Sequence, residues 1–106
     1  MSQNRNKSLG TLGLAMKSGN VASGEFLTEQ AIRAGTAKLV IVAEDASDNT
    51  KKKFRNSCLY YQIPLAIQFN KDTLGKAIGK EFRASLAILD PGFALSISKN
   101  LELEEM

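Results

Sequence analysis

Residue types that carry much of protein chemistry are scarce or missing from this chain of 106 residues: it has no histidine, no tryptophan and one cysteine, Cys58. The chain therefore offers no internal disulfide, no Cys/His zinc site and no Ser–His or Cys–His nucleophile pair. No apolar run approaches the roughly 18–20 residues that span a bilayer, and the polar start lacks the apolar core of a signal peptide. We expect a soluble, cytoplasmic protein with no metal site and no cofactor.

Charge is unevenly distributed along the chain. The formal net charge is +3, but residues 1–89 carry 13 basic and 7 acidic side chains, whereas residues 90–106 carry one basic side chain, Lys99, and four acidic ones. The length is typical of one domain, so we expect a single domain over 1–106 with a frayed acidic tail at 101–106. A basic body favours a polyanionic partner, first of all a nucleic acid, although lysines that only solvate the surface would give the same composition.

Apolar residues alternate between helix-like and strand-like spacing, with no linker and no repeat. Continuous apolar runs at Lys38–Ala43 and Ala84–Leu89 predict strands buried on both faces. Shorter strands are expected near Val21–Ala22 and over Pro64–Phe69. The expected order is αβαβαβαβα, which predicts an α/β fold: a three-layer α-β-α sandwich with a four-stranded mixed sheet. The strands near 40 and 66 should be parallel neighbours, and the strand near 21 should lie antiparallel at an edge.

The helices between these strands have predictable faces and ends. The buried face of the second helix is expected to consist of Leu27, Ala31 and Ala34. That of the third is expected to consist of Phe54, Cys58 and Tyr61. Side chains that can accept a hydrogen bond from the first turn precede three helices, and the expected N-caps are Ser47 or Asp48, Asn70 or Asp72, and Asp90.

Three features suggest catalysis, and each has a simpler structural interpretation. Gly75–Glu81 resembles a phosphate-binding P-loop, but it has one residue too few between the glycines and no Ser or Thr after the lysine. The acidic cluster at 44–48 lacks the second set of ligands that a Mg²⁺ site of the receiver type needs. Cys58 lies on an apolar helix face, where a free thiol packs as a small hydrophobe, whereas a phosphocarrier enzyme would need it reactive. We therefore expect a binding protein and no enzyme.

Basic side chains cluster where the predicted elements begin. Lys51, Lys52 and Arg55 fall on the face of the third helix away from its apolar side. Lys71 begins the next helix, and Lys80 and Arg83 lie in the loop before the last strand. Loops and helix starts also expose backbone N–H groups that bind phosphate, so these positions point to nucleic-acid binding more than charges in the middle of a helix do. For Lys51, Lys52 and Arg55, a merely solvated helix face is an equally good interpretation.

Several blocks of sequence resemble a known family. Gly35–Thr50, then Cys58, Pro64 and Leu74–Gly79, are similar to the kink-turn RNA-binding ribosomal-protein superfamily of the seven-Ae and thirty-e type. Within it the chain most resembles small bacterial YlxQ-like ribosomal proteins, over a core of about residues 8–98. The resemblance implies an α-β-α sandwich with a four-stranded mixed sheet. It also implies a ribosomal or ribonucleoprotein role in which structured RNA, first of all ribosomal RNA, is the partner.

In that superfamily the RNA lies against the start of the second helix, where a G-x-N-E-x-x-K pattern reads sheared G·A pairs. Gly24 matches the glycine, but Phe26, Leu27 and Gln30 stand where the family has Asn, Glu and Lys. Phe and Leu cannot make the hydrogen bonds by which Asn and Glu read base edges. The resemblance therefore implies recognition through phosphate contacts and RNA shape, with weaker base readout than in kink-turn-binding relatives.

Together, the resemblance and the basic positions predict a set of RNA-binding residues: Gly24, Glu25, Phe26, Leu27, Gln30, Thr50, Lys51, Lys71, Lys80 and Arg83. Phe26 has two interpretations, because it either packs with Leu27 and Ile32 against a loop or stacks on an unpaired base. The alternative function is a protein-interaction module that has lost RNA binding and uses the Phe26–Leu27 surface. We expect a monomer with no small-molecule substrate and no membrane contact.

Overall fold

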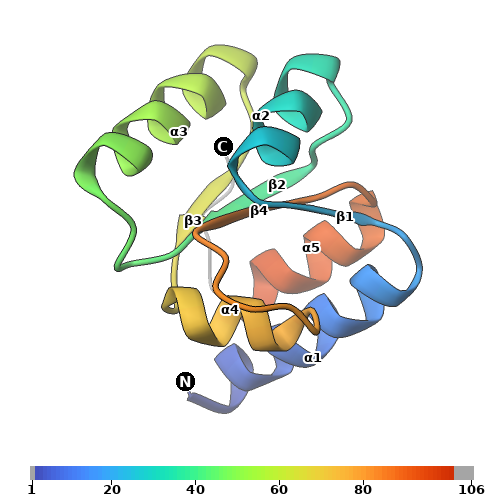
Figure 1. Ribbon diagram of the computed structural model, residues 1–106. Coiled ribbons are helices and arrows are strands. Elements are labelled where there is room, and N and C mark those ends of the chain that lie inside the picture. The colour runs from blue at the N-terminus through green and yellow to red at the C-terminus, as the bar shows by residue number, and fades with distance from the viewer. Residues whose placement is uncertain (1, 102–106) are drawn as a thin grey trace.

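The computed structural model describes residues 2–101, with side chains from Arg5 onward. Five helices and four strands alternate along them, as predicted (Figure 1). The helices are α1 (Ser2–Lys17), α2 (Glu25–Ala34), α3 (Asp48–Tyr61), α4 (Lys71–Ala77) and α5 (Pro91–Asn100). The strands are β1 (Val21–Ser23), β2 (Leu39–Val42), β3 (Leu65–Ile67) and β4 (Ser85–Ile88). Helices α2 and α3 cover one face of the sheet and α1, α4 and α5 cover the other, so the expected sandwich is confirmed.

The sheet is mixed, with strand order β1-β4-β2-β3. β2 and β3 are parallel, as the helix between them requires, and β1 runs antiparallel to β4 at the edge. β4 is also antiparallel to β2, with Val40 opposite Ala87. The parallel pair and the antiparallel edge strand predicted from the sequence are both confirmed.

The core lies on both faces of the two central strands. Every residue of β2 and β4 is buried, which explains why their sequences, apart from Ser85, are apolar without alternation. Ile32 and Phe54 fill the side under α2 and α3, whereas Leu12, Leu74 and Ile97 fill the other side. These side chains fix the helices to the sheet and thereby fix the positions of the loops between them.

Two predicted helix faces are wrong by about one position. In α2 the buried residues are Thr28, Ala31 and Ile32, whereas Leu27 is 46% exposed and Ala34 is exposed. The two possible faces share Ala31, and the buried one includes the larger, branched Ile32 in place of the face that Ala34 would complete.

In α3 the face begins as predicted, since Phe54 and Cys58 are buried, but Tyr61 is 42% exposed. Gln62 adopts a left-handed φ of 58° and ends the helix, so Ile63 fills the position beneath the sheet that Tyr61 was expected to fill.

Two element ends also differ from the prediction. β3 ends at Ile67 and not at Phe69, because Phe69 has a left-handed φ of 65° that turns the chain into α4. The last helix closes on Leu101, which is buried against the core, so the expectation that fraying begins at residue 101 is wrong at that residue. The rest of the predicted acidic tail, 102–106, lies outside the described residues. Between residues 2 and 101 no helix has the length and apolarity that crossing a bilayer requires.

Candidate nucleic-acid interface

One edge of the sheet collects the loops that contain some of the predicted residues and that precede the helices carrying the others. Ser23 at the end of β1 pairs with Leu86 near the start of β4. Val42 at the end of β2 pairs with Ser85 of β4 and with Ile67 at the end of β3. The connecting loops therefore converge to the left of the sheet in Figure 1. We call this region the loop edge, and it consists of Gly24, residues 43–47 and 68–70, Lys71 at the start of α4, and residues 78–84.

Hydrogen bonds hold the candidate residues of the loop edge in fixed relative positions. The Gly24 N–H donates to the Ser85 carbonyl at 2.9 Å, which fixes the start of α2 to β4. The Arg83 N–H donates to the Lys71 carbonyl at 3.1 Å, and Arg83 Nε donates to Ser23 Oγ at 3.4 Å. Arg83 therefore links α4 to the end of β1, and it brings Gly24, Lys71 and its own guanidinium to one place.

The acidic residues after β2 have a structural use. Asp45 Oδ1 accepts a hydrogen bond from the Lys71 N–H at 2.9 Å, and the Glu44 N–H donates to the Phe69 carbonyl at 2.7 Å. These bonds join the β2–α3 loop to the β3–α4 loop. In the part of the chain from residue 2 to 101, no three His, Cys, Asp or Glu residues gather as a metal ion would require.

The helices that follow strands at the loop edge start in different ways. Ser47 Oγ accepts from the Thr50 N–H at 3.1 Å, and Asn70 Oδ1 accepts from the Thr73 N–H at 2.8 Å, so α3 and α4 are capped by side chains, as predicted. α2 is preceded by Gly24, with φ 92° and ψ 163°, which has no side chain to do this. The first N–H groups of a helix lack partners within it, so the start of α2 offers donors toward the loop edge.

The residues that replace the family's base readers point outward. Phe26 is 77% exposed and Gln30 is exposed one turn further along α2. The interpretation that Phe26 packs with Leu27 and Ile32 is wrong, because Ile32 is fully buried and Leu27 faces solvent. Base stacking by Phe26 stays a prediction.

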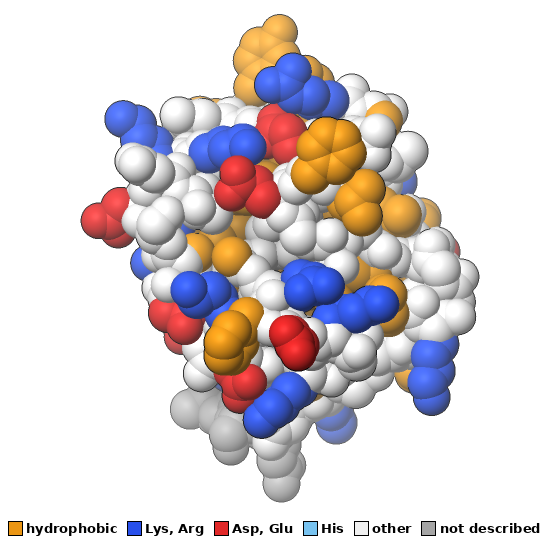
Figure 2. Space-filling model, in the orientation of Figure 1, with side chains coloured by type: hydrophobic (Ala, Val, Ile, Leu, Met, Phe, Trp, Pro, Cys, Tyr) orange, Lys and Arg blue, Asp and Glu red, His pale blue; other side chains and the backbone are white. Residues whose placement is uncertain are grey.

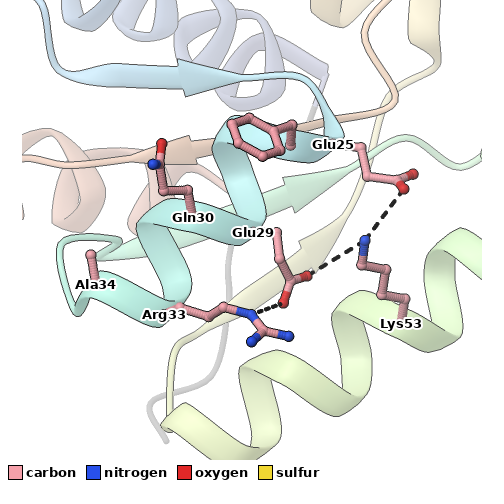
Figure 3. Close-up of a pocket in the computed structure, with 7 residues that line it drawn as sticks. Glu25, Glu29, Gln30, Arg33, Ala34 and Lys53 are labelled. Atoms are coloured by element: carbon pink, nitrogen blue, oxygen red, sulfur yellow. Dashed lines mark hydrogen bonds and ion pairs between the residues drawn. The ribbon is translucent and has the colours of Figure 1, made fainter.

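A groove of about 800 Å³ lies between α2 and α3, next to the loop edge (Figure 3). Lys53 reaches across it from α3, and its Nζ lies 3.3 Å from Glu25 Oε2 and 3.8 Å from Glu29 Oε2. Arg33 Nε contacts Glu29 Oε1 at 3.1 Å. The carboxylate of Glu25, a predicted RNA-binding residue, is thus held toward α3 by a cation.

The remaining candidate residues are in the first turn of α3 and in the loop before β4. Thr50 and Lys51 are partly exposed in the first turn of α3, where Ser47 Oγ also contacts Thr50 Oγ1 at 2.9 Å. Lys80 is exposed in the loop before β4, and its N–H donates to the Gly75 carbonyl at 2.8 Å. On the face in Figure 2, basic side chains are interspersed with acidic and apolar ones, and no area is uniformly basic.

Sequence reasoning missed Phe82, which is 67% exposed between Lys80 and Arg83. It lines a separate hollow of about 410 Å³ with Lys80, and its carbonyl accepts from Arg83 Nη1 at 2.9 Å. An aromatic side chain flanked by cations in a loop is typical of a base-stacking position, and this pattern in the sequence could have identified it.

The features that suggested catalysis have structural roles. A Cβ at Gly75 would collide with the Glu81 carbonyl, so this glycine allows the chain to pass closely over α4 and forms no phosphate loop. Cys58 is 2% exposed. Burial, and secondarily the Glu29 carboxylate, raise the pKa of its thiol to about 12, which disfavours the thiolate that a reactive cysteine needs.

The chain matches a known family over most of its length. The family model described as ribosomal protein L7Ae/L30e/S12e/Gadd45 matches residues 6–97. This chain belongs to that family. The L7Ae/L30e resemblance drawn from the blocks at 35–50 and 74–79 is thereby confirmed.

Named members of the L7Ae/L30e family are similar along most of this chain. The RNA-binding protein YlxQ of Bacillus subtilis is 47% identical over 83 residues, which are 78% of this chain and 83% of that protein. The RNA-binding protein YlxQ of Enterococcus faecium is 41% identical over 93% of this chain and 95% of its own length. The large ribosomal subunit protein eL30 of Methanoregula boonei is 36% identical over 77% of this chain and 84% of its own.

Solved structures show the same fold. A Bacillus halodurans protein of unknown function superposes with a TM-score of 0.88 at 36% identity, covering 91% of this chain and 97% of that one. A 15.5kD RNA binding protein of Giardia lamblia superposes with a TM-score of 0.80, covering 96% of this chain and 91% of that one. At 20% identity, the second likeness concerns the fold alone.

Proposed function

We propose that this chain is a non-catalytic, ribosome-associated RNA-binding protein that recognises structured RNA, first of all ribosomal RNA, at the loop edge. We further propose that it is a single-domain monomer of the cytoplasm. The observation that carries the proposal is the convergence of Gly24, Lys71 and Arg83, which three hydrogen bonds bring to one edge of the sheet. The names of the two YlxQ relatives, both RNA-binding proteins, support the same partner.

The chemistry of the loop edge suits the RNA backbone better than base edges. Lys71 and Arg83 supply cations for phosphate oxygens, and the start of α2 supplies backbone N–H donors without a capping side chain. Phe26 and Leu27 offer aromatic and apolar surface where the family offers polar readers. Recognition should therefore depend on phosphate spacing and RNA shape.

The decisive experiment replaces Lys51, Lys71 and Arg83 together by Ala. Filter-binding titrations would use two labelled probes: a kink-turn stem-loop RNA with sheared G·A pairs, and the same stem-loop fully Watson–Crick paired. Each lost phosphate contact lowers the log–log salt slope by about 0.9, so the variant should bind more weakly and lose about two to three units of slope.

A matched control removes the same charge elsewhere. Lys17, Lys38 and Lys99 are exposed outside the loop edge, and their joint replacement by Ala should leave affinity nearly unchanged. Unchanged affinity and slope in the first triple variant, or an equal loss in the control, would overturn the assignment of the site. An affinity ratio near one between the two RNA probes is expected, and strong preference for the kinked stem would overturn the expectation of weak base readout.

A second candidate function, a protein-interaction module, is favoured by one observation. Phe26 and Leu27 are exposed, and Phe26 lines a groove of about 800 Å³ between α2 and α3. A partner bound there should stay bound at high salt and be lost with Phe26→Ser, whereas Leu95→Ser, a change at an exposed leucine of α5, should have no effect. RNA bound at the loop edge should instead dissociate as salt rises.

A further inference from the structure

The first turn of α1 lies against the loop between β3 and α4 through one specific contact. The Arg5 guanidinium carbon is 4.8 Å from the centre of the Phe69 ring, a cation–π geometry. Phe69 is buried although its φ is 65°, a conformation that bulky residues rarely adopt. Arg5 itself is exposed, so part of the guanidinium stays open to solvent while its central carbon lies over the ring.

This contact borders a groove of about 340 Å³ that continues the loop edge. Asn6, Glu44 and Asn70 line it together with Arg5 and Phe69. The Glu44 N–H donates to the Phe69 carbonyl at 2.7 Å, so the groove is built on the same joined loops that position Lys71. The N-terminal end of the chain lies on that side of the molecule in Figure 1.

The charges in the groove select the kind of ligand. Its described lining carries one cation, Arg5, and one anion, Glu44, so it lacks the positive excess that a phosphate site needs. A flat, uncharged group with polar edges suits it better, because arginine planes stack on nucleobases. A groove of this size lies at the lower end of the about 300–1,000 Å³ range of small-ligand pockets.

We propose that Arg5, which lies over the Phe69 ring, is a stacking platform for an unpaired nucleobase of the RNA bound at the loop edge. The proposal rests on the RNA-binding function proposed above and adds a contact outside the candidate set. Arg5 lies one residue before the 6–97 segment that matches the family model, whereas Phe69 lies within it.

Hydrogen-bonding groups beside the platform favour guanine. The carbonyl oxygen of the Asn70 side chain accepts from the Thr73 N–H at 2.8 Å, which leaves the side-chain amide N–H groups of Asn70 as donors. Glu44 adds a carboxylate acceptor. The Watson–Crick edge of guanine presents N–H donors beside a carbonyl acceptor, which complements this pair of side chains.

The first test compares three variants on the Watson–Crick stem-loop RNA extended by a single-stranded GGA tail. Arg5→Ala should weaken binding by about 5- to 100-fold, the range expected for loss of one stacked base. Arg5→Lys keeps the charge but loses the plane, so it should not restore affinity. Lys7→Ala is the matched control, because Lys7 is an exposed cation two residues further along α1, about 200° around the helix. Equal affinities for Arg5→Ala and Lys7→Ala, or full rescue by Arg5→Lys, would overturn the platform.

The second test detects the base directly by NMR of the ¹⁵N-labelled protein. Guanosine 5′-monophosphate should shift the side-chain amide signals of Asn6 and Asn70 more than cytidine 5′-monophosphate does, and Glu44→Gln should reduce this difference. Equal shifts with both nucleotides would overturn the base preference. If the Lys51/Lys71/Arg83 variant loses RNA binding while Arg5→Ala does not, the platform fails and the proposed function stands; if neither loses it, the proposed function fails.

Discussion

Helices α2 and α3 lie side by side on one face of the sheet and both begin at the loop edge, but their starts are built differently. Ser47 has ordinary extended backbone and caps α3 with its hydroxyl, 3.1 Å from the Thr50 N–H. Gly24 holds a φ of 92° and leaves α2 with no side-chain cap. The start of α3 is satisfied by the chain itself, which stabilises the fold. The start of α2 lacks such a cap, which costs stability and leaves its first N–H groups as the donors that the proposed RNA contact would use.

The largest effect is expected at Gly24. Its combination of φ 92° and ψ 163° is essentially restricted to glycine, so Gly24→Ala should cost about 1–3 kcal/mol of unfolding free energy, measured by urea denaturation. RNA affinity should also fall, because the strained residue can relax only by moving the first turn of α2.

Gly10→Ala is the matched control for Gly24→Ala. Gly10 lies inside α1, and a Cβ there would meet nothing within 4 Å. Alanine should therefore be neutral or stabilise the protein by up to about 1 kcal/mol. If both substitutions gave the same change in unfolding free energy, the backbone at Gly24 would not be the special feature of α2.

A smaller effect is expected at Ser47. Ser47→Ala removes the cap of α3 and should cost about 1 kcal/mol of unfolding free energy, while RNA affinity stays within about twofold of the wild type. Ser47→Thr keeps the capping oxygen and should restore most of the loss. A large fall in RNA affinity with Ser47→Ala would show that the start of α3 also contributes directly to binding.

Local patterns in the sequence predicted most of the fold. Caps at Ser47, Asn70 and Asp90 follow from side chains that reach N–H groups three residues away, and the buried runs of β2 and β4 are visible as apolar sequence. The face of α2 could not be predicted this way, because the Leu27 and Ile32 faces share Ala31 and have similar periodicity. The packing of α2 against β4, β1 and α3, a tertiary feature, decides between them.

The candidate site also has parts that local sequence predicts and parts that depend on tertiary contacts. The sequence singled out Lys71 and Arg83 separately, and the structure brings them together because β2 and β3 are parallel and β4 is antiparallel to β2, so that the end of β3 and the start of β4 lie at one edge. Contacts between residues far apart in sequence, such as Lys53 with Glu25 and Arg5 with Phe69, leave no local pattern. The sequence therefore identified residues of the edge at which RNA is proposed to bind, while the side chains that reach it from α1 and α3 required the structure.

The smallest effect, and the one that tests the open start of α2 most directly, concerns Glu25. Its carboxylate is half exposed in the first turn of α2 and lies 3.3 Å from Lys53 Nζ. An exposed ion pair contributes only about 0.2–1 kcal/mol, so Glu25→Gln should change the unfolding free energy little.

The same change should raise RNA affinity a few-fold and steepen its salt dependence, because it removes a negative charge beside the proposed phosphate site and releases Lys53. Lys53→Gln should have the opposite effect, since it leaves Glu25 without its cation. The RNA affinity of each variant is measured at increasing salt concentration on the same stem-loop RNA. If Glu25→Gln instead weakens binding, Glu25 accepts a hydrogen bond from the RNA itself, and the start of α2 then binds through a side chain as well as through its backbone.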